Sequence, residues 1–460
     1  MKRTLGQIAE MIGVELPNQA FRDVIVEGAS INTRTLKENN LFIPFKGEKV
    51  DGHTFVKQAF EQGAAATLWQ EGVENPPLDV PLLLVKDPEL ALQEMARVYR
   101  SQSSFKVVAI TGSNGKTTTK DMVAGVLSTQ FLVQKTEGNF NNELGLPLTL
   151  INVEEETEVA VLEMGMSGFR EIAFLTELAS PDIAVITNIG ESHMQYLGSR
   201  EGIARAKFEI TEGLSEHGIL FYYGDEPLLK ELVEKSTGFC SASYGYEQTN
   251  GLFPKEVEVT ENGSKVLLTA DRDQFIEVPV LGRHNVLNAL AAVRVGLHLG
   301  MTLSGIAQGF RSMKLTSMRM ERVNGAKGEI IINDAYNASP TSMKAVIKFA
   351  EDMPVEGRKI LLLGDILELG PNEEAFHREI GKEIHPTKID YVLTFGERAH
   401  LIAEEASEHF PKGRVQSFGL EKAELINMLK GLTTANDLIV VKGSRGMKLE
   451  EVVEALQINV

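Results

Sequence analysis

Short apolar runs alternate with amphipathic segments through the middle of the chain. Residues 117–130 carry apolar positions at helical spacing, and residues 284–300 form a predicted helix that ends at a glycine. Strand–helix alternation of this kind predicts a doubly wound, mostly parallel sheet. The apolar runs of strand length are FKVVAITG (105–112), EVAVLEMG (158–165), PDIAVITNIG (181–190) and GILFYYGDE (218–226).

A second series of the same kind begins near Lys314. Helical segments separate its apolar runs, so we expect another parallel α/β layer, Rossmann-like in its order. The predicted strands are GEIIINDAY (328–336), RKILLLGDI (358–366), DYVLTFG (390–396) and DLIVVKGS (437–444).

The first hundred residues contain shorter elements. MKRTLGQIAEMIGVEL (1–16) has the pattern of an amphipathic helix, and the polar SQSS (101–104) is typical of a linker. Between them lie two predicted strands and a helix: LFIPF (41–45), PLLLVKD (81–87) and DPELALQEMARVYRSQ (87–102). We therefore predict an α/β protein of three domains. They are a small N-terminal α/β domain (1–103), a central P-loop-type doubly wound parallel sheet (104–313) and a C-terminal Rossmann-like α/β domain (314–460).

Composition narrows the class of protein. The chain has 460 residues, a net charge of −18 and one cysteine, Cys240. The negative charge argues against binding to nucleic acid or to an anionic membrane surface. One cysteine excludes an intrachain disulfide and suits a reducing compartment. The N-terminal segment lacks the apolar core of a signal peptide, and no apolar run approaches the length of a membrane span. We expect a cytoplasmic protein.

The stretch AITGSNGKTTTKD (109–121) is the main candidate for chemistry. A strand, a Gly-rich turn and a helix beginning at Lys116 can direct backbone N–H groups and a lysine at a polyphosphate. The hydroxyl of Thr117 could bind Mg²⁺. The longer P-loop signature requires a glycine six residues before the lysine, where this chain has Ile110. An ordinary strand–helix turn and a dinucleotide-binding turn are the alternatives, but an ATP or GTP loop fits the strand context and the lysine better.

Two further candidates follow neighbouring strands. Glu163 ends the run 158–165, and His193 follows the run 181–190. In a doubly wound sheet both positions open onto the edge that carries the phosphate loop. They could hold a second Mg²⁺ beside Thr117, for which a carboxylate is the better ligand. Taken singly, His193 could be a loop or capping residue and Glu163 a surface carboxylate. Lys207, in EGIARAKFEITEG (201–213), reads by itself as a solvated helix lysine.

The motifs TGSNGKTT, LEMG, TNIGESHM, ARAKFEI and GRHNVLNALAA occur in this order. Together they resemble the ATP-dependent Mur ligases of peptidoglycan synthesis, and folylpolyglutamate synthase shares their three-domain plan. Five stretches spread over all three predicted domains resemble the branch that joins D-alanyl-D-alanine to UDP-N-acetylmuramoyl-tripeptide. They are LFIPFKGEKVDGHTFVKQAFEQGA (41–64), TEGNFNNELGLPLTL (136–150), NDAYNASPTSM (333–343), LLGDILELG (362–370) and VKGSRGM (441–447). In this family the loop takes the shorter form G-x-x-G-K-T, so Ile110 is not a defect.

The resemblance implies roles for residues of the central and C-terminal domains. Lys207 matches the family's carbamylated lysine, whose CO₂ adduct acts as a metal ligand. Asn285 and Asn288 match asparagines near the adenine, and Arg319 and Asp334 match residues that the C-terminal domain brings to the nucleotide. Lys116, Lys207 and His193 are the implied catalytic residues, and two Mg²⁺ ions are implied at Thr117, Glu163, His193 and Lys207. The implied ATP phosphate ligands are Gly112, Ser113, Asn114, Gly115, Lys116, Thr117 and Thr118.

The resemblance also assigns the UDP moiety to the N-terminal domain. Two groups of residues match that region: Asn32, Thr33 and Arg34, and Asp51 and His53. Relatives usually begin the first motif with Asp, whereas this chain has Asn32. Without the resemblance, residues 28–36 read as a polar loop.

The implied reaction is an ATP-driven amide ligation through an acyl phosphate, with closure of the C-terminal domain to exclude water. The implied partners are small molecules, and nothing in the sequence requires more than a monomer. Another amide ligase of the superfamily, a P-loop GTPase or kinase, and a non-enzymatic nucleotide-binding protein are the alternatives. The sequence does not distinguish lysine from diaminopimelate at the third position of the tripeptide.

Overall fold

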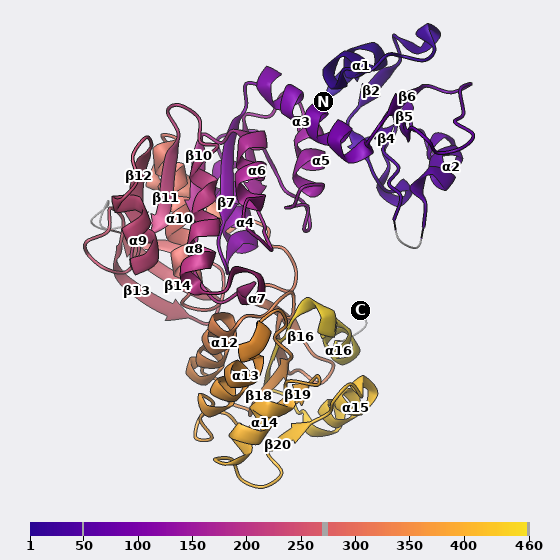
Figure 1. The fold of residues 1–460 in the computed structure, drawn as a ribbon. Coiled ribbons are helices and arrows are strands. Elements are labelled where there is room, and N and C mark those ends of the chain that lie inside the picture. Colours follow the sequence, from indigo (N-terminus) through magenta and orange to yellow (C-terminus); the bar gives the residue numbers. More distant parts are fainter. Residues whose placement is uncertain (48–49, 269–274, 458–460) are drawn as a thin grey trace.

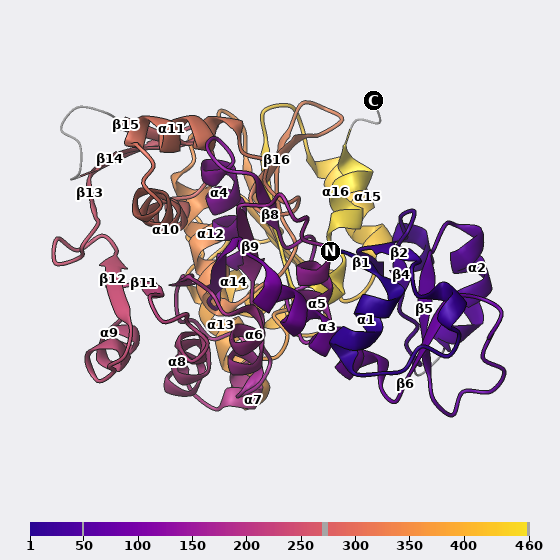
Figure 2. The ribbon, with the colours of Figure 1, turned by 90° about the horizontal axis from the view of Figure 1, so that it is seen from above.

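The computed structural model describes residues 1–47, 50–268 and 275–457. The chain forms three lobes in sequence order (Figure 1). The central lobe lies between the other two, and in the view from above the N-terminal lobe lies at the right of the molecule (Figure 2). Residues 48–49, within the stretch 41–64 that carried part of the resemblance, lie outside the described residues.

The N-terminal lobe is built on a four-stranded parallel sheet in the order β3-β4-β5-β6, beside a two-stranded antiparallel pair, β1-β2. Apolar side chains of α1 and α3 cover one face of the parallel sheet, and those of α2 pack on the other. The prediction that residues 1–16 form a single helix is wrong at its start. Residues 2–4 pair with β2, and the helix begins only after the cap at Thr4. The elements are β1 (Lys2–Thr4), α1 (Leu5–Ile12), β2 (Ile25–Glu27), β3 (Ala29–Ser30), β4 (Leu41–Phe42), α2 (Val56–Glu61), β5 (Ala66–Gln70), β6 (Leu82–Val85) and α3 (Pro88–Gln102).

The central lobe confirms the predicted doubly wound sheet. Its six strands follow the order β12-β11-β10-β7-β9-β8, and every pairing is parallel. Helices α4, α10 and α11 share a core on one face, and α6 and α8 share a core on the other. The strands are β7 (Lys106–Thr111), β8 (Val133–Lys135), β9 (Val159–Glu163), β10 (Ile183–Ile186), β11 (Ile219–Tyr223) and β12 (Cys240–Tyr244). The helices are α4 (Lys116–Leu127), α5 (Gly145–Ile151), α6 (Glu171–Ala179), α7 (Met194–Leu197), α8 (Arg200–Phe208), α9 (Pro227–Glu234), α10 (Asn285–His298) and α11 (Leu303–Ser312).

A three-stranded antiparallel sheet follows β12 and was not predicted. It consists of β13 (Pro254–Thr260), β14 (Gly263–Leu268) and β15 (Phe275–Val278). Strand β13 is a solvent-facing edge strand with no fully buried residue, so its sequence PKEVEVT lacks the apolar run that marked the other strands. Its partner β14 supplies buried Val266 and Leu268 to the core around α10.

The C-terminal lobe contains the second predicted sheet, in the order β16-β17-β21-β18-β19-β20, with only the edge strand β16 antiparallel. Helices α12, α13 and α14 lie on one face, and α15 and α16 on the other. The strands are β16 (Glu321–Asn324), β17 (Ile330–Asp334), β18 (Lys359–Gly364), β19 (Tyr391–Phe395), β20 (Val415–Ser417) and β21 (Leu438–Lys442). The helices are α12 (Pro340–Asp352), α13 (Glu373–Lys382), α14 (His400–Ser407), α15 (Lys422–Leu432) and α16 (Glu450–Leu456).

One long helix joins the N-terminal and central lobes. Apolar residues of α3 belong to the same core as those of α1 in the N-terminal lobe and of α5 and α6 in the central lobe. Arg100 near its end donates to the backbone carbonyls of Ala179 and Ser180. In the part of the chain that the structure describes, no helix has the length and apolar character needed to cross a membrane.

Candidate active site

The phosphate loop connects β7 to α4 and depends on two glycines. Gly112 has φ 149° and Gly115 has φ 79°, conformations that side chains rarely adopt. A Cβ at Gly112 would lie 1.8 Å from Thr187 Oγ1, and one at Gly115 would lie 2.5 Å from Asn288 Oδ1. Both positions therefore require glycine, for backbone conformation and for space.

Neighbouring side chains hold this loop rigidly. The Asn114 N–H donates to Asn188 Oδ1 over 2.9 Å, and the Asn114 carbonyl accepts from Asn188 Nδ2 over 2.9 Å and from Thr187 Oγ1 over 2.6 Å. In contrast, Ser113 Oγ and Asn114 Nδ2 are buried and have no hydrogen-bond partner within the protein. Buried polar groups are rarely left unpaired, so these two atoms are available to pair with a polar ligand.

Lys116 begins helix α4 and donates from Nζ to the Gly112 carbonyl over 2.7 Å. Burial lowers its pKa, with a further lowering from nearby Arg319, while Glu163 opposes both effects. A desolvated ammonium at a helix N-terminus would gain strongly from an anionic ligand.

Glu163 ends β9, next to the loop in the sheet, and is buried. Its Oε1 accepts from Asn141 Nδ2 over 2.8 Å, but its Oε2 is buried without a partner. An unpaired carboxylate oxygen fits a cation ligand, and the donor set of Glu163 oxygen and Thr117 hydroxyl suits Mg²⁺. Within the described ranges no three His, Cys, Asp or Glu side chains gather to hold a metal by themselves. Magnesium here would therefore depend on phosphate and water oxygens for the rest of its shell, as it commonly does.

His193 lines the same cavity as Lys116 and Glu163, and Lys207 is close enough to Lys116 to be repelled by it, but the two residues have different environments. His193 has φ 62°, and its Nδ1 is 2.7 Å from Glu368 Oε2 of the C-terminal lobe. That contact is the main cause of a lowered pKa at Glu368, although the carboxylate lies off the axis of the ring N–H and makes no well-formed hydrogen bond. Lys207 is fully buried, and desolvation, with added repulsion from Lys116, places its pKa well below the usual value.

Except for Gly112, the predicted nucleotide residues line a cavity of about 510 Å³ between the central and C-terminal lobes. Loop residues 113–118 line it together with Asn285, Asn288, Arg319 and Asp334. Asn288 Nδ2 donates to Asn285 Oδ1 over 2.7 Å, and Asn288 Oδ1 accepts from Thr119 over 3.2 Å, so these asparagines also fix α4 against α10.

A second cavity, of about 630 Å³, shares Lys116 and Arg319 with the first and is lined by Glu163 and His193. Residues 141–143, 165–167 and 169–171 also line this cavity. A phosphate donor in the first cavity and an acceptor in the second would therefore meet at the two shared cations.

The C-terminal lobe contacts the loop directly. Arg319 Nη2 donates to Thr117 Oγ1 over 3.1 Å, and the Arg319 guanidinium stacks on the Tyr336 ring at 4.1 Å. Ser339 Oγ donates to Asn114 Oδ1 over 2.8 Å. Arg319 Nε is buried without a partner, which is a further group free for an anion.

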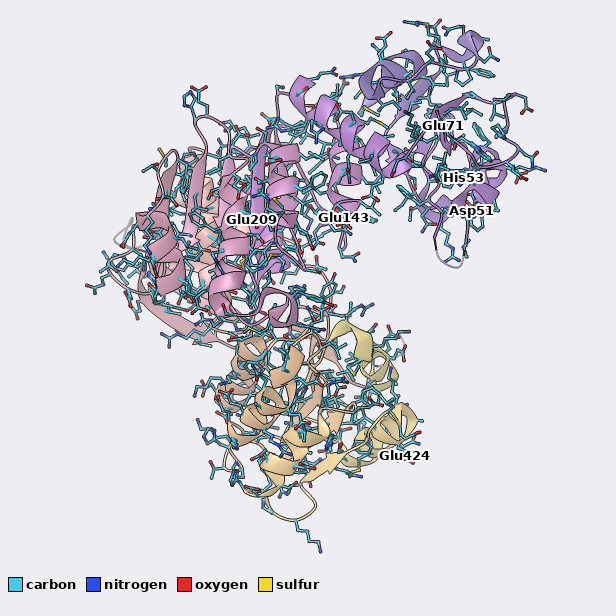
Figure 3. All side chains as sticks on the ribbon, viewed as in Figure 1. Asp51, His53, Glu71, Glu143, Glu209 and Glu424 are labelled. Carbon is cyan, nitrogen blue, oxygen red and sulfur yellow. The ribbon has the colours of Figure 1, made fainter. Side chains whose placement is uncertain are left out.

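The five residues predicted for the UDP moiety lie near the carboxyl ends of the strands of the N-terminal sheet. Asn32 Oδ1 accepts from the Arg34 N–H over 3.0 Å and caps a short 3₁₀ turn at Thr33–Thr35. Asp51 Oδ1 lies 2.7 Å from His53 Nδ1, and His53 Nε2 accepts from the Gln70 N–H over 3.2 Å. Figure 3 shows Asp51 and His53 side by side in this lobe. Asn32 alone of the five lines a cavity of about 850 Å³ between the N-terminal and central lobes.

Two residues that contact or adjoin the predicted site residues were not predicted from the sequence. Lys442, buried in the nucleotide cavity, donates to Asp334 Oδ2 over 2.5 Å and to the Asn337 carbonyl over 2.9 Å. Glu209 (Figure 3) accepts from the N–H groups of Arg170 and Ala173 and so fixes the start of α6, where the loop after Glu163 ends. Both residues occur in the quoted motifs VKGSRGM and ARAKFEI, but only the fold reveals their partners.

Comparison with known proteins agrees with this geometry. Residues 25–100 match the Mur ligase family catalytic domain, residues 110–296 the Mur ligase middle domain, and residues 318–445 the Mur ligase glutamate ligase domain. The UDP-N-acetylmuramoyl-tripeptide–D-alanyl-D-alanine ligase of Bacillus subtilis is 50% identical, over 99% of this chain and 98% of its own. The Escherichia coli ligase of the same name is 35% identical, over 99% and 98%.

Solved structures show the same similarity. MurF from Acinetobacter baumannii superimposes with a TM-score of 0.87 at 28% identity, covering 99% of this chain and 98% of that one. MurF from Thermotoga maritima, in complex with ADP, gives a TM-score of 0.80 at 28% identity over 94% and 97%. The three domain matches and the 50% identity to the Bacillus subtilis ligase agree with the geometry of the phosphate loop. The chain belongs to the Mur ligase family.

Proposed function

We propose that the protein is an ATP-dependent ligase that joins D-alanyl-D-alanine to UDP-N-acetylmuramoyl-tripeptide. The observation that carries this proposal is the 50% identity to the Bacillus subtilis ligase of that name, over 99% of this chain and 98% of that one. The meeting of two cavities at Lys116 and Arg319 supports it, because such a ligase must bring a phosphate donor and a carboxylate acceptor together there.

The first step transfers the γ-phosphoryl group to the terminal carboxylate of the tripeptide, which gives an acyl phosphate and ADP. The anionic carboxylate approaches the anionic triphosphate in this step, so charge neutralisation is the main task of the site. Lys116 and Arg319 supply fixed positive charge, and the N–H groups of the loop and the N-terminus of α4 add to it. We assign the γ-phosphate to the boundary between the two cavities, where the buried Arg319 Nε lacks a partner.

Magnesium would be held by Thr117 and Glu163, with His193 and a carbamylated Lys207 as further ligands of a second ion. When bound, it would neutralise phosphate oxygens and align them. Carbamylation requires an uncharged amine to react with CO₂. Burial provides one, because it places the pKa of Lys207 well below the usual value.

In the second step the free amine of D-alanyl-D-alanine attacks the acyl phosphate carbon, and inorganic phosphate leaves through a tetrahedral intermediate. Water would hydrolyse the acyl phosphate. The contacts from Ser339 and Arg319 to the loop would help to exclude water from the site. The domains proposed for these tasks are residues 1–103 for the UDP substrate, 104–313 for ATP, and 314–460 for the nucleotide and the dipeptide. We propose that the protein acts as a monomer, in the cytoplasm where ATP and UDP-linked precursors occur.

A phosphate-release assay tests the proposal. The protein is incubated with ATP, Mg²⁺ and UDP-N-acetylmuramoyl-tripeptide, and the amine is varied among D-alanyl-D-alanine, D-glutamate and L-lysine. We expect phosphate release only with D-alanyl-D-alanine, together with a product larger by the dipeptide in a mass spectrum. Release with another amine would favour a different Mur-type ligase. Release with no amine acceptor would favour a GTPase- or kinase-like hydrolase.

A further inference from the structure

The segment Thr316–Met320, which carries Arg319, has an unusual backbone. It links α11 to β16 and belongs to no helix or strand. Met318 has φ 61° and Met320 has φ 52°, so left-handed residues with long side chains stand on both sides of Arg319. Such residues adopt this conformation only where the surroundings enforce it, and they concentrate at functional sites.

Three carboxylates enforce it here. The N–H of Thr316 donates to Asp121 Oδ2 over 2.7 Å, that of Met318 to Glu321 Oε2 over 2.9 Å, and that of Met320 to Asp334 Oδ1 over 3.1 Å. Every second N–H of the segment is thus accepted by a side chain, where a strand or helix would use backbone carbonyls. The conformation around Arg319 is therefore set by these acids.

The two ends of the segment are attached to different lobes. Asp121 lies on α4, the helix that begins with Lys116 and Thr117, and Asp334 ends β17 in the C-terminal sheet. Between these attachments Arg319 reaches Thr117 Oγ1 over 3.1 Å. Helix α4 therefore contacts this segment twice. Asp121 binds the start of the segment at Thr316, and Thr117 accepts a hydrogen bond from Arg319 near its end.

We propose that Asp121 and Glu321 are positioning residues, which hold Thr316–Met320 as an arm and so direct Arg319 to the γ-phosphate. The inference rests on the proposed function, in which Arg319 acts on that phosphate. Neither acid lines the cavity of about 510 Å³ or the cavity of about 630 Å³ that share Arg319, so we expect their effect on turnover to pass through Arg319. Misplacement of a positioned group by about 1 Å can lower a rate by about 10²-fold, which sets the scale.

Asp121 also pairs with two lysines, and the effect of losing these ion pairs must be distinguished from the effect of losing the contact with Thr316. Its Oδ1 accepts from Lys135 Nζ over 2.6 Å, and Lys120 Nζ lies 3.7 Å away. A purely structural acid would matter through these ion pairs. Lys135→Met removes the nearer pair and leaves the contact with Thr316 in place, so it is the matched control.

A double-mutant cycle tests the proposal by turnover at saturating substrates. In the natural background we expect Asp121→Ala and Glu321→Ala each to lower kcat about 10- to 100-fold, and Lys135→Met to lower it less than about 3-fold. In an Arg319→Ala background the same two acid variants should change kcat less than about 2-fold, because the group they position is gone. Equal effects in both backgrounds, or a Lys135→Met effect as large as that of Asp121→Ala, would overturn the proposal. If Asp121→Ala does not fold, Glu321→Ala alone decides, since Glu321 lies outside the buried ion pairs.

Amide hydrogen exchange gives a readout independent of turnover. With the non-hydrolysable analogue AMP-PNP and Mg²⁺ bound, we expect residues 314–322 to exchange faster in both acid variants than in the natural protein or Lys135→Met, and residues 105–120 to stay unchanged. Unchanged exchange at 314–322 would refute the arm. If the natural protein released no phosphate with any amine, the proposed function would fail. The exchange measurement would still test whether Asp121 and Glu321 hold the arm in place.

Discussion

The phosphate loop of the central lobe and the polar turns of the N-terminal lobe look alike in sequence, since both are short polar stretches that follow buried strands. Their polar atoms differ in the fold. Around the loop, Ser113 Oγ, Asn114 Nδ2, Glu163 Oε2 and Arg319 Nε are buried and unpaired. In the N-terminal lobe, Asp51, His53 and the Gln70 N–H form a closed chain of contacts, and Asn32 caps its own turn.

This difference separates two kinds of polar residue. A buried polar atom without a partner costs free energy until a ligand supplies one, whereas a paired atom already contributes to folding. We therefore expect substitutions at the loop to reduce activity while sparing stability, and substitutions at the N-terminal turns to reduce stability while sparing ATP chemistry.

Replacing the loop lysine should have the largest effect on activity. Lys116→Met removes fixed positive charge from the phosphates, and we expect kcat to fall about 10²- to 10³-fold, the scale found when a preorganised electrostatic group is lost. The melting temperature should stay the same or rise, because burial already disfavours the charged ammonium. Phosphate release and a thermal melt measure the two effects. A large loss of stability in this variant would contradict the distinction between the two regions.

Glu163→Gln should have the second-largest effect on activity. It keeps an oxygen for Asn141 but removes the charge of the unpaired oxygen, so we expect about 10²-fold lower kcat and a higher Mg²⁺ requirement. Titration of activity with Mg²⁺ measures both quantities. Glu177→Gln, at an exposed position of α6, is the control and should behave like the natural protein. An unchanged Mg²⁺ dependence in Glu163→Gln would remove Glu163 from the metal site.

Lys207 offers a test that depends on pH. Its lowered pKa leaves the Lys207 amine uncharged, and so available to CO₂, at lower pH than an exposed lysine, and protonation competes more strongly as pH falls. Removing bicarbonate should therefore reduce activity, more at pH 6.5 than at pH 8.5, and adding it back should restore activity. Lys207→Ala should lose about 10- to 100-fold in kcat, on the scale of groups that orient a metal site, and recover partly with short-chain carboxylates. Full activity of this variant without any carboxylate would exclude the role.

The candidate site of the central lobe could be nominated from the sequence because its parts are recognisable from local sequence patterns. The run 105–112, the glycines and Lys116 are adjacent in sequence, and the strands before Glu163 and His193 bring those residues to the same edge of the sheet. The arm around Arg319 was not predictable in this way. Asp121 and Thr316 lie 195 positions apart, and nothing in either stretch indicates that one accepts from the other.

The same limit applies to structure outside the site. Strand β13 and the pairing of residues 2–4 with β2 were missed because each is short or solvent-exposed and is stabilised by a partner strand, not by an apolar run of its own. The pairing of His53 with Asp51 and Gln70 was also hidden, so a motif that resemblance assigned to UDP contains groups already used inside the lobe.

His53→Ala should affect folding and leave ATP chemistry intact. It would leave the Gln70 N–H without its acceptor and Asp51 without its ring partner, at a cost of about 1–3 kcal/mol in the free energy of unfolding. The KM for ATP should not change. Glu71→Gln is the control, since Glu71 is exposed and directly follows β5 (Figure 3). A stable His53→Ala protein with a greatly raised KM for the UDP substrate would instead place His53 in direct contact with that substrate.

Asn32→Asp should have the smallest effect of all. Asn and Asp cap short turns about equally well, so the free energy of unfolding should change by less than about 0.5 kcal/mol. If the side chain serves only as a cap, the KM for UDP-N-acetylmuramoyl-tripeptide should also stay within about threefold, because an oxygen accepts from the Arg34 N–H in either case. Asn32 nevertheless lines the cavity between the N-terminal and central lobes. A tenfold change in KM with unchanged stability would therefore show that Asn32 meets the substrate directly, and that one residue can act both as a paired cap and as a binding group.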